Sequence, residues 1–495
     1  MGMRKEIRFL RRGREVHLRD IAPSLTLLDY LRLTEHAVGT KEGCAEGDCG
    51  ACTVVLRKHV NGRLVYQPVN ACILLAGQAD GAEVITVEDL ADDAALHPVQ
   101  QMMAEQHGSQ CGFCTPGFIM TLFAFYHAEH AGPRDRSVVN DWIAGNLCRC
   151  TGYRPIVDAA LSSCSGNTGD KFTAQESAVA PALRGLEDDG DVFVGSDARF
   201  FAAPTSIAGL ATLYAAHSDA VLVGGATDVG LWITKKLQTL PKIIWLGRVR
   251  ALAAIEDMPD AVTFGAAVSH ETALPWLAAI DPDLGELMRR FAGKQIRNVG
   301  TIGGNIANGS PIGDTPPALI ALGATVTLQK GDAERTLALE DFFLAYGKQD
   351  RAAGEFVRTV RVPKLKAHEH FRCYKISKRF DQDISAAMGA FKFTLDGSRI
   401  EAARLAFGGM AATPKRARQA EGALANGQLS NEASWQPAMA ALDRDFTPIT
   451  DHRASAAYRG DVARALLRKA LLELGGTATQ NTRIVGIRET ADASS

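Results

Sequence analysis

Two groups of four cysteines in the first third of the chain constrain its fold more than any other feature. The first group has the spacing C-x4-C-x2-C, with a fourth cysteine after 19 intervening residues: Cys44, Cys49, Cys52 and Cys72. The second group joins a C-x2-C pair to a C-x-C pair across 33 intervening residues: Cys111, Cys114, Cys148 and Cys150. Four thiolates at such spacings favour a metal or an iron–sulfur cluster over a disulfide framework.

The first group indicates a particular cluster. C-x4-C-x2-C…C is the spacing of plant-type 2Fe–2S proteins. The loop 43–52 carries three glycines, and their permissive backbone lets a loop wrap a cluster and direct amide N–H groups at sulfur. Zinc is the alternative, but zinc favours paired C-x2-C knuckles. Cys164 and Cys373 have no partners at metal spacing, so we expect them to be small buried residues.

Composition is that of an ordinary globular protein, with 46% apolar and 22% charged residues. At roughly 150 residues per domain, a chain of this length predicts about three domains. The net charge of −2 gives no indication of nucleic-acid binding. The N-terminus lacks a secretory signal and no stretch is apolar enough for a membrane span. We therefore expect a cytoplasmic protein, in which thiols stay reduced.

Residues 1–83 read as a small β-rich domain. Arg12-Gly13 and Asn61-Gly62 predict hairpin turns, and Leu25–Leu33 has helical spacing with Ser24 as its expected cap. Residues 84–165 switch to helical periodicity, which predicts a small bundle that carries the second cysteine group on its loops. Its four expected helices are His97–His107, Phe118–His130, Ser137–Asn146 with Ser137 as cap, and Pro155–Ser163.

The bundle histidines His97, His107 and His127 are expected to be packed or surface residues and not ligands. Residues 166–194 are poor in aromatic and β-branched apolar side chains, which predicts an exposed linker. Residues 195–368 and 369–480 alternate strands and helices as two further domains, and 481–495 reads as a mobile tail.

Two loops rich in small residues interrupt the third domain: GGATDVG, from Gly224, and GTIGGNIANGSPIGD, from Gly300. Backbone N–H groups in such loops can hold the pyrophosphate of a nucleotide. Neither loop has the G-x-G-x-x-G pattern of a Rossmann unit or the G-x4-G-K-[ST] pattern of a P-loop. The motifs therefore favour a nucleotide site of another architecture.

Taken together, the motifs resemble those of the molybdenum hydroxylases, the xanthine dehydrogenase family. GCAEGDCGAC, QCGFCTPG, NLCRCTGYRP, FAGKQIRN, TIGGNIANGSPIGD and FGGM occur in the family's order and span most of residues 1–165 and 195–480. The resemblance implies a multidomain α+β chain with four folded domains. These are a β-grasp plant-type ferredoxin domain, a four-helix-bundle 2Fe–2S domain, an FAD-binding domain of the PCMH/VAO type, and an α+β domain of the CO dehydrogenase flavoprotein type.

Residue roles follow from the resemblance at matching positions. The two cysteine groups would hold two 2Fe–2S clusters, and Gln110 would touch a molybdopterin on a partner. The implied FAD contacts are Leu222, Val223, Gly224, Gly225, Ala226, Thr227, Asp228, Val229, Phe291, Thr301, Ile302, Gly303, Gly304, Asn305, Asp314, Val357 and Lys375. The first FAD loop departs from the family's Gly-Asn-Thr-Glu, because Gly225-Ala226-Thr227-Asp228 lacks the amide side chain.

The resemblance also implies a function. The chain looks like the iron–sulfur and FAD small subunit of a bacterial two-subunit xanthine dehydrogenase, in a heterotetramer of two small and two large chains. The large subunit's molybdopterin would oxidise hypoxanthine and xanthine to urate, and electrons would pass through both clusters to FAD and then to NAD+. No catalytic residue for the hydroxylation is expected in this chain.

Two other readings stay open. One is a related molybdenum hydroxylase that oxidises an aldehyde or an N-heterocycle, and the other is a free-standing iron–sulfur flavoprotein electron carrier. The loop Ser377–Ser385 resembles the family segment beside the flavin that influences the choice between NAD+ and oxygen. Its charged residues Arg379, Asp381 and Asp383 are those expected near a nicotinamide site, although charged surface would look the same.

Overall fold

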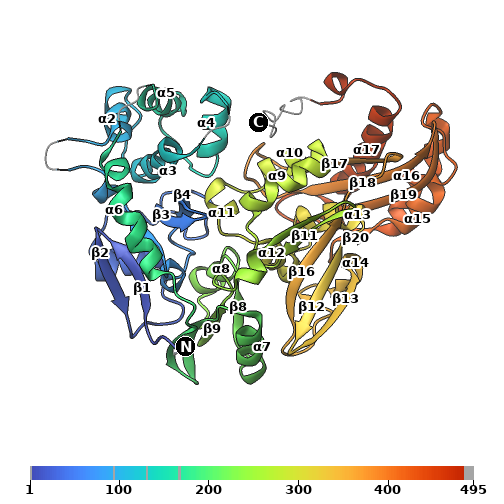
Figure 1. Cartoon of the computed structure of the whole chain (residues 1–495). Helices are drawn as coiled ribbons and strands as arrows, with labels where there is room; N and C mark the ends of the chain where they lie inside the picture. Colours follow the sequence, from blue (N-terminus) through green and yellow to red (C-terminus); the bar gives the residue numbers. More distant parts are fainter. Residues whose placement is uncertain (1–2, 93–94, 130–131, 166–168, 484–495) are drawn as a thin grey trace. The chain divides into compact units, whose positions relative to one another are not determined.

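The computed structural model describes residues 3–92, 95–129, 132–165 and 169–483, and Figure 1 shows the element order. The chain forms two compact units. The first unit comprises the chain up to Arg250 together with Gly293–Gly300, and the second contains Ala251–Ala292 and the chain from Thr301 to Thr490. Gly293–Gly300, which holds most of the motif FAGKQIRN, therefore belongs to the unit with the cysteines.

The first unit opens with a five-stranded sheet of order β2-β1-β5-β3-β4. β1 and β5 are parallel, and the remaining neighbours are antiparallel. The strands are β1 (Ile7–Arg11), β2 (Arg14–Leu18), β3 (Thr53–Val60), β4 (Arg63–Asn70) and β5 (Glu83–Ile85). Both predicted hairpin turns form, and their central residues have φ between 49° and 81°. Short helical turns connect and follow the strands: α1 (Leu27–Asp29) and η1 (Tyr30–Thr34) between β2 and β3, η2 (Ala76–Ala79) between β4 and β5, and η3 (Val87–Asp89) after β5.

The helix expected over Leu25–Leu33 starts later than its periodicity suggested. Thr26, and not Ser24, caps it: the Thr26 hydroxyl accepts a hydrogen bond from the backbone N–H of Asp29. In the bundle, Asp135 caps α4 in place of Ser137, because its carboxylate accepts from two backbone N–H groups. The bundle helices are α2 (Pro98–Glu105), α3 (Thr115–His127), α4 (Arg136–Ile143) and α5 (Arg154–Ser163).

The segment expected to be an exposed linker instead forms a helix, α6 (Lys171–Leu186). Asp170 caps it, and Phe172, Leu183 and Leu186 are buried. The prediction of an exposed segment was wrong because three apolar side chains, widely spaced in sequence, suffice to hold one face of a helix on a sheet.

The first unit ends with a four-stranded sheet of order β6-β7-β9-β8, in which β7, β9 and β8 are parallel. Its strands are β6 (Val192–Ser196), β7 (Arg199–Ala203), β8 (Val221–Val223) and β9 (Lys242–Trp245). The helices that accompany it are α7 (Ile207–Ala216) and α8 (Val229–Thr234), whereas the inserted turn α11 (Lys294–Arg297) lies against β4 and α4. The loop Gly224–Asp228 joins β8 to α8, so the first candidate FAD loop follows the carboxyl end of a strand.

The second unit contains an antiparallel sheet of order β10-β11-β16-β12-β13. Its strands are β10 (Ile255–Met258), β11 (Ala261–Gly265), β12 (Thr325–Lys330), β13 (Ala333–Ala338) and β16 (Phe356–Pro363). Other elements here are α9 (His270–Ile280), α10 (Pro282–Arg290), α12 (Ile302–Asn308), α13 (Thr315–Leu322), α14 (Leu339–Phe342), β14 (Phe343–Ala345) and β15 (Lys348–Gln349), after η4 (Arg250–Ala253). The second small-residue loop is shorter than expected, since α12 occupies its centre.

The C-terminal part of the second unit is a four-stranded antiparallel sheet packed on helices around a core that includes Phe391, Phe393 and Trp435. Its elements are β17 (Glu369–Ile376), β18 (Ala387–Asp396), β19 (Arg399–Gly408), β20 (Lys415–Arg416), α15 (Arg418–Leu424), η5 (Glu432–Trp435), α16 (Gln436–Asp445), α17 (Ala456–Leu474) and η6 (Thr479–Asn481). Within the described ranges, no helix is both long and apolar enough to cross a membrane.

The start of the expected mobile tail is anchored. Arg483 donates to both carboxylate oxygens of Asp283, at 2.6 and 3.0 Å, and to both of Glu473, at 3.0 and 2.6 Å. Both carboxylates are buried. One guanidinium therefore ties the C-terminal segment to α10 and α17. The rest of the predicted tail, 484–495, lies outside the described residues.

Asp281, at the start of α10, makes the stability of this region depend on pH. Burial, reinforced by the neighbouring Asp283 carboxylate, raises the pKa of Asp281 to about 7. Between its unfolded pKa of about 4 and this value, only the folded state holds the proton, so stability falls as pH rises from about 4 to 7. We expect Asp281→Asn to be more stable than the parent at pH 8 by about 1–3 kcal/mol, with the difference vanishing towards pH 4.

Thermal unfolding at pH 4 to 8 would check this expectation, with Asp332→Asn as an exposed control in the turn after β12. Asparagine can still cap α10, because its side-chain oxygen accepts from the backbone N–H of Asp283 as the aspartate does. A difference between Asp281→Asn and the parent that does not change with pH would contradict the assignment.

Candidate functional site

The first cysteine group converges on the loop before β3. Cys44 Sγ accepts hydrogen bonds from the backbone N–H groups of Asp48 and Cys49, both at 3.3 Å, and Cys49 Sγ accepts one from Cys44 at 3.3 Å. The sulfurs of Cys52 and Cys72 lie 3.2 Å apart and are buried. A hydrogen bond from the Cys49 thiol and these backbone amides lower the pKa of Cys44 to about 5. A thiol held in this way is readily available as a thiolate ligand.

The second group lies on the loops before α3 and α5. The Cys111 thiol contacts Cys150, and the Cys114 thiol contacts Cys148. Cys148 Sγ also accepts from the backbone N–H of Thr151 at 3.4 Å and from its hydroxyl at 3.3 Å, and these bonds lower the pKa of the thiol against the opposing effect of burial. Cys111 and Cys150 are exposed.

Both cysteine groups fit iron–sulfur clusters. All ten cysteines are described and none is in a disulfide. The amide groups that point at sulfur are the donors that tune a cluster's potential, and zinc sites have no need of a glycine-rich loop of such donors. Gln110, expected to touch a pterin, is exposed directly beside Cys111. Phe113, in the same loop, is 49% exposed.

The inserted segment Gly293–Gly300 joins the two cysteine domains within the first unit. Asn298 donates to the carbonyl of Pro68 in β4 at 2.8 Å, and the Lys294 ammonium lies 4.1 Å from the ring centroid of Trp142 in α4. Between them, the fully buried Gln295 reaches both domains. From the sequence, only Phe291 of the motif FAGKQIRN was expected to contribute, to the flavin site, because nothing in the spacing of the other residues relates them to the cysteines.

The first candidate FAD loop is tightly built. A Cβ placed at Gly225 would lie 1.8 Å from the carbonyl oxygen of Val299, so only glycine fits there. The Gly224 carbonyl accepts from Gln78 Nε2 at 3.2 Å and from Trp245 Nε1 at 3.1 Å. Ala226 has φ of +61°, a conformation that asparagine adopts more readily than alanine. That preference explains physically why an amide residue suits the position that Ala226 occupies.

The other candidate FAD residues lie in the second unit. The Thr301 hydroxyl accepts from the backbone N–H of Gly304 at 3.0 Å and so caps α12. Asn305 Oδ1 accepts a short hydrogen bond from the hydroxyl of Thr315. Val357 is buried in β16, and the ring of Phe291 lies 4.6 Å from that of His270. Ile302 and Gly303 are buried in the first turn of α12, where they set the backbone path of the loop.

Asp314 and Lys375, which the sequence placed in the flavin site separately, form a buried ion pair. Lys375 Nζ lies 2.5 Å from Asp314 Oδ2, and the Ser385 hydroxyl donates to Asp314 Oδ1 at 2.5 Å. Asp314 is 3% and Lys375 6% exposed. Ser385 ends the loop Ser377–Ser385, Lys375 lies in β17, and Asp314 directly precedes α13. The Asp314 carboxylate therefore connects the loop, the strand and the helix.

A cavity of about 390 Å³ lies beside this pair, within the second unit. Arg290 and Phe380 form part of its wall, with the guanidinium carbon 4.1 Å from the ring centroid. Arg290 also donates to the carbonyl of Phe380 at 2.9 Å. The Lys469 ammonium lies 4.5 Å from the Tyr374 centroid. Cationic side chains in the lining (Arg290, Lys375, Lys469 and Arg483) outnumber the acidic ones (Asp283 and Glu286). The cavity is thus suited to an anionic ligand with a flat ring.

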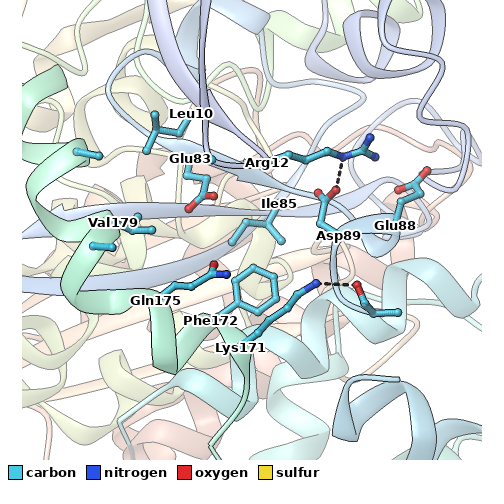
Figure 2. Close-up of a pocket in the computed structure, with 14 residues that line it drawn as sticks. Leu10, Arg12, Glu83, Ile85, Glu88, Asp89, Lys171, Phe172, Gln175 and Val179 are labelled. Carbon is cyan, nitrogen blue, oxygen red and sulfur yellow. Dashed lines mark hydrogen bonds and ion pairs between the residues drawn. The ribbon is translucent and has the colours of Figure 1, made fainter. Parts of the chain in front are cut away.

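A second cavity, of about 560 Å³, lies between α6 and the first sheet (Figure 2). Arg12 is bound to Asp89 at 2.7 Å, and Lys171 donates to the carbonyl of Ala91 at 2.6 Å. Ile85 and Phe172 form apolar wall. Arg12 and Lys171 already bind acceptors within the protein. We therefore interpret the cavity as a gap where α6 packs on the sheet and not as a candidate binding site.

His97, His127 and Asp170 come close enough together to hold a metal. However, His97 Nδ1 accepts from the backbone N–H of Val99, and Nε2 lies 2.8 Å from Asp170. The other Asp170 oxygen accepts from the backbone N–H and hydroxyl of Thr173. Since both His97 nitrogens are in use, the cluster fastens α6 to the bundle, and the expectation that these two histidines are packed residues is confirmed.

Comparisons with known proteins agree with this architecture. Four family models match in order: a 2Fe-2S iron-sulfur cluster binding domain (residues 11–76), a 2Fe-2S binding domain (86–161), the FAD binding domain in molybdopterin dehydrogenase (196–365) and the CO dehydrogenase flavoprotein C-terminal domain (372–474). The four models confirm the predicted multidomain fold class.

Among characterised relatives, the xanthine dehydrogenase of Emericella nidulans is 32% identical over 511 residues, covering 89% of this chain and 36% of its own. The xanthine dehydrogenase/oxidase of Rattus norvegicus is 32% identical over 458 residues, covering 82% of this chain and 34% of its own. The chain therefore spans about a third of the length of these relatives.

Solved structures match somewhat more than half of the chain. Reconstituted CO dehydrogenase from Oligotropha carboxidovorans superposes with a TM-score of 0.53 at 27% identity, over 57% of this chain and 99% of that one. Quinoline 2-oxidoreductase from Pseudomonas putida 86 gives a TM-score of 0.51 at 24% identity, over 55% and 95%, which shows a shared fold.

The cysteine groups and the matched domains define an iron–sulfur flavoprotein with two 2Fe–2S domains and one FAD domain. The chain belongs to the molybdenum hydroxylase family.

Proposed function

We propose that the chain is the electron-transfer part of a xanthine dehydrogenase, and that it passes electrons from a partner's molybdopterin centre to NAD+. The observation that carries the proposal is the pair of cysteine groups, each with hydrogen-bond donors at its sulfurs, in one chain with FAD-binding and flavoprotein domains. The relatives at 32% identity, named xanthine dehydrogenases, support the purine assignment.

The cofactors supply the redox chemistry when bound: clusters transfer single electrons, and a flavin accepts single electrons and delivers a hydride. The residues of this chain hold and tune these groups. Cys44, Cys49, Cys52 and Cys72 would bind one cluster, and Cys111, Cys114, Cys148 and Cys150 the other. The backbone donors at Cys44 and Cys148 stabilise negative charge on sulfur, which is how a protein adjusts a cluster's potential.

For the flavin, four roles are proposed. The loops that begin at Leu222 and at Thr301 each offer backbone N–H groups of the kind that hold a pyrophosphate. Phe291 would pack on the ring system, and Asp314 would accept a hydrogen bond while Lys375 balances its charge. Val357 would contribute apolar contact from β16.

The acceptor proposed is NAD+. The cavity beside Lys375 supports this choice, because Arg290 and Lys469 suit the dinucleotide's phosphates and Phe380 suits a flat ring. Gln110 and Phe113, exposed around Cys111, mark the face to which a molybdopterin-binding subunit would bind, in a tetramer of two small and two large chains. Cysteine groups that must stay reduced suit the cytoplasm.

The test is co-purification of the native complex, followed by metal analysis and assays. About four iron atoms, one FAD and one molybdenum are expected for each pair of chains. Hypoxanthine and xanthine should both be oxidised, with faster reoxidation by NAD+ than by oxygen. Turnover of another heterocycle or an aldehyde in their place would refute the purine assignment. A molybdenum-free monomer would show a free-standing electron carrier.

A further inference from the structure

The ligands of the two cysteine groups are linked by a single hydrogen bond. The backbone N–H of Leu147 donates to the carbonyl oxygen of Cys49 at 2.9 Å. Cys49 belongs to the first group, and Leu147 is bonded to Cys148 of the second. The route from one sulfur to the other therefore consists of covalent bonds and this one hydrogen bond. Electronic coupling passes more readily through bonds than through space, so this contact is the natural route between the groups.

A buried polar network holds this contact in place, and Gln295 is at its centre. Gln295 is fully buried, and its Nε2 donates to Asn146 Oδ1 at 2.9 Å and to Thr121 Oγ1 at 3.0 Å. The Thr121 hydroxyl donates to Asn146 Oδ1 at 2.7 Å. Asn146 in turn donates from Nδ2 to the carbonyl of Gly50 at 3.1 Å.

The network adjoins the linking hydrogen bond on one side. Asn146 is the residue before Leu147, and Gly50 is the residue after Cys49, so the Asn146–Gly50 contact lies next to the Leu147–Cys49 contact. Two contiguous hydrogen bonds fix the separation of the two backbones. Gln295 orients the Asn146 amide that makes one of them, as a buried network with mutual partners does.

The side chain of Gln295 fits because residue 145 is a glycine. A Cβ built at Gly145 would lie 2.0 Å from Gln295 Oε1, so any larger residue would displace the amide. Gln295 itself comes from the inserted turn α11, far in sequence from both cysteine groups. A segment of the chain beyond the first candidate FAD loop thus completes the contact between the two cysteine domains.

We propose that Gln295 is a positioning residue for electron transfer between the two cluster sites, acting through Asn146 on the Leu147–Cys49 hydrogen bond. The proposal rests on the relay in the proposed function. In the step concerned, one electron leaves the cluster at one cysteine group and one arrives at the cluster at the other, while no bond forms and no proton moves. In the described part of the chain, the hydrogen bonds of Gln295 go to Thr53, Thr121 and Asn146 and not to a cysteine, so Gln295 would affect only the coupling between the two cluster sites.

The experiment uses the full chain loaded with both clusters and FAD, without substrate, NAD+ or partner, so that it is independent of the purine and NAD+ assignments. Gln295→Met keeps the length of the side chain and removes its donor. In Gly145→Ala the added methyl group displaces the side-chain amide of Gln295, because it takes the space of Gln295 Oε1. Gln100→Met is the matched control, because this α2 glutamine likewise donates one hydrogen bond from Nε2, to the backbone carbonyl of Val87 in the same unit, and its partners Val87 and His97 are not next to a cysteine.

Three measurements are made on each variant. Hydrogen exchange at Leu147 should speed up by roughly tenfold in Gln295→Met and Gly145→Ala, the effect of losing about one buried hydrogen bond. The magnetic interaction between the two clusters, read by electron paramagnetic resonance of the dithionite-reduced protein, should weaken. The rate of electron transfer between the clusters after rapid photoreduction should fall several-fold in both variants. Their iron content should equal that of the parent.

Parent-like exchange, magnetic interaction and transfer rate in both variants would overturn the proposal. Equal slowing in Gln100→Met would also overturn it, since Gln295 would then act only through general stability. If Gln295→Met fails to load iron, the result for Gly145→Ala alone tests the proposal, because that variant keeps Gln295, Asn146 and Thr121. Loss of purine oxidation in the assembled complex with unaltered magnetic interaction would count against the proposed function and not against this role of Gln295.

Discussion

Replacing Cys52 with alanine is expected to remove one cluster and leave the other. Cys52 and Cys72 are 1% and 2% exposed and sit in the core of the first sheet, where no other side chain can supply a sulfur ligand. Iron should fall from about four to about two atoms per chain, and one of two paramagnetic signals should vanish. The first domain should also lose stability, because metal binding energy contributes to folding energy.

Cys164→Ala is the matched control, because Cys164 is a half-buried free thiol outside both groups. It should retain all iron. Cys148→Ala should remove the other signal and the other half of the iron. Full iron content in Cys52→Ala would mean that the first group does not bind a cluster through this residue, and loss of both clusters in either variant would contradict two independent sites.

Lys375→Met is expected to destabilise the second unit strongly. It leaves Asp314 almost fully buried, and among the residues that the structure describes only the Ser385 hydroxyl remains as a side-chain donor. Removing one partner of a buried ion pair costs about 3–5 kcal/mol, because the remaining charge is uncompensated. For a unit of this size the midpoint of thermal unfolding should fall by roughly 10 °C. FAD content after purification should fall as well, on the proposed role of the pair.

A double variant separates charge from packing. Asp314→Asn together with Lys375→Met removes both charges and keeps an oxygen that accepts from Ser385, so most of the lost stability should return. Differential scanning calorimetry with and without added FAD gives both readouts. A single variant within about 1 kcal/mol of the parent would show that solvent reaches the pair and screens it.

Much of the architecture could be predicted from local patterns. Cysteine spacing predicted two cluster sites, and the turn residues Arg12-Gly13 and Asn61-Gly62 predicted the hairpins, because a positive φ is a property of the turn residues themselves. Helix caps were less predictable. Thr26 and Asp135 took the places expected for Ser24 and Ser137, since neighbouring polar residues have nearly equal capping strength and packing chooses among them.

The helix α6 escaped prediction for a related reason. Its segment is poor in aromatic and β-branched apolar residues, and the helix is stabilised by its contact with the first sheet and by the Asp170–His97 bond. Likewise, Asp314 and Lys375 were each expected near the flavin, but their pairing joins residues 61 positions apart and leaves no trace in the spacing.

The sequence by itself determined which chemistry this protein can hold, because thiolate spacing and small-residue loops act over a few residues, where the covalent chain sets the geometry. Only the tertiary structure decided how the two cysteine groups are connected. Gln295 lies 145 residues beyond Cys150, and its place between the groups depends on the inserted segment Gly293–Gly300 packing into the first unit. Contacts of that range are selected by burial and hydrogen-bond satisfaction, which no local pattern records.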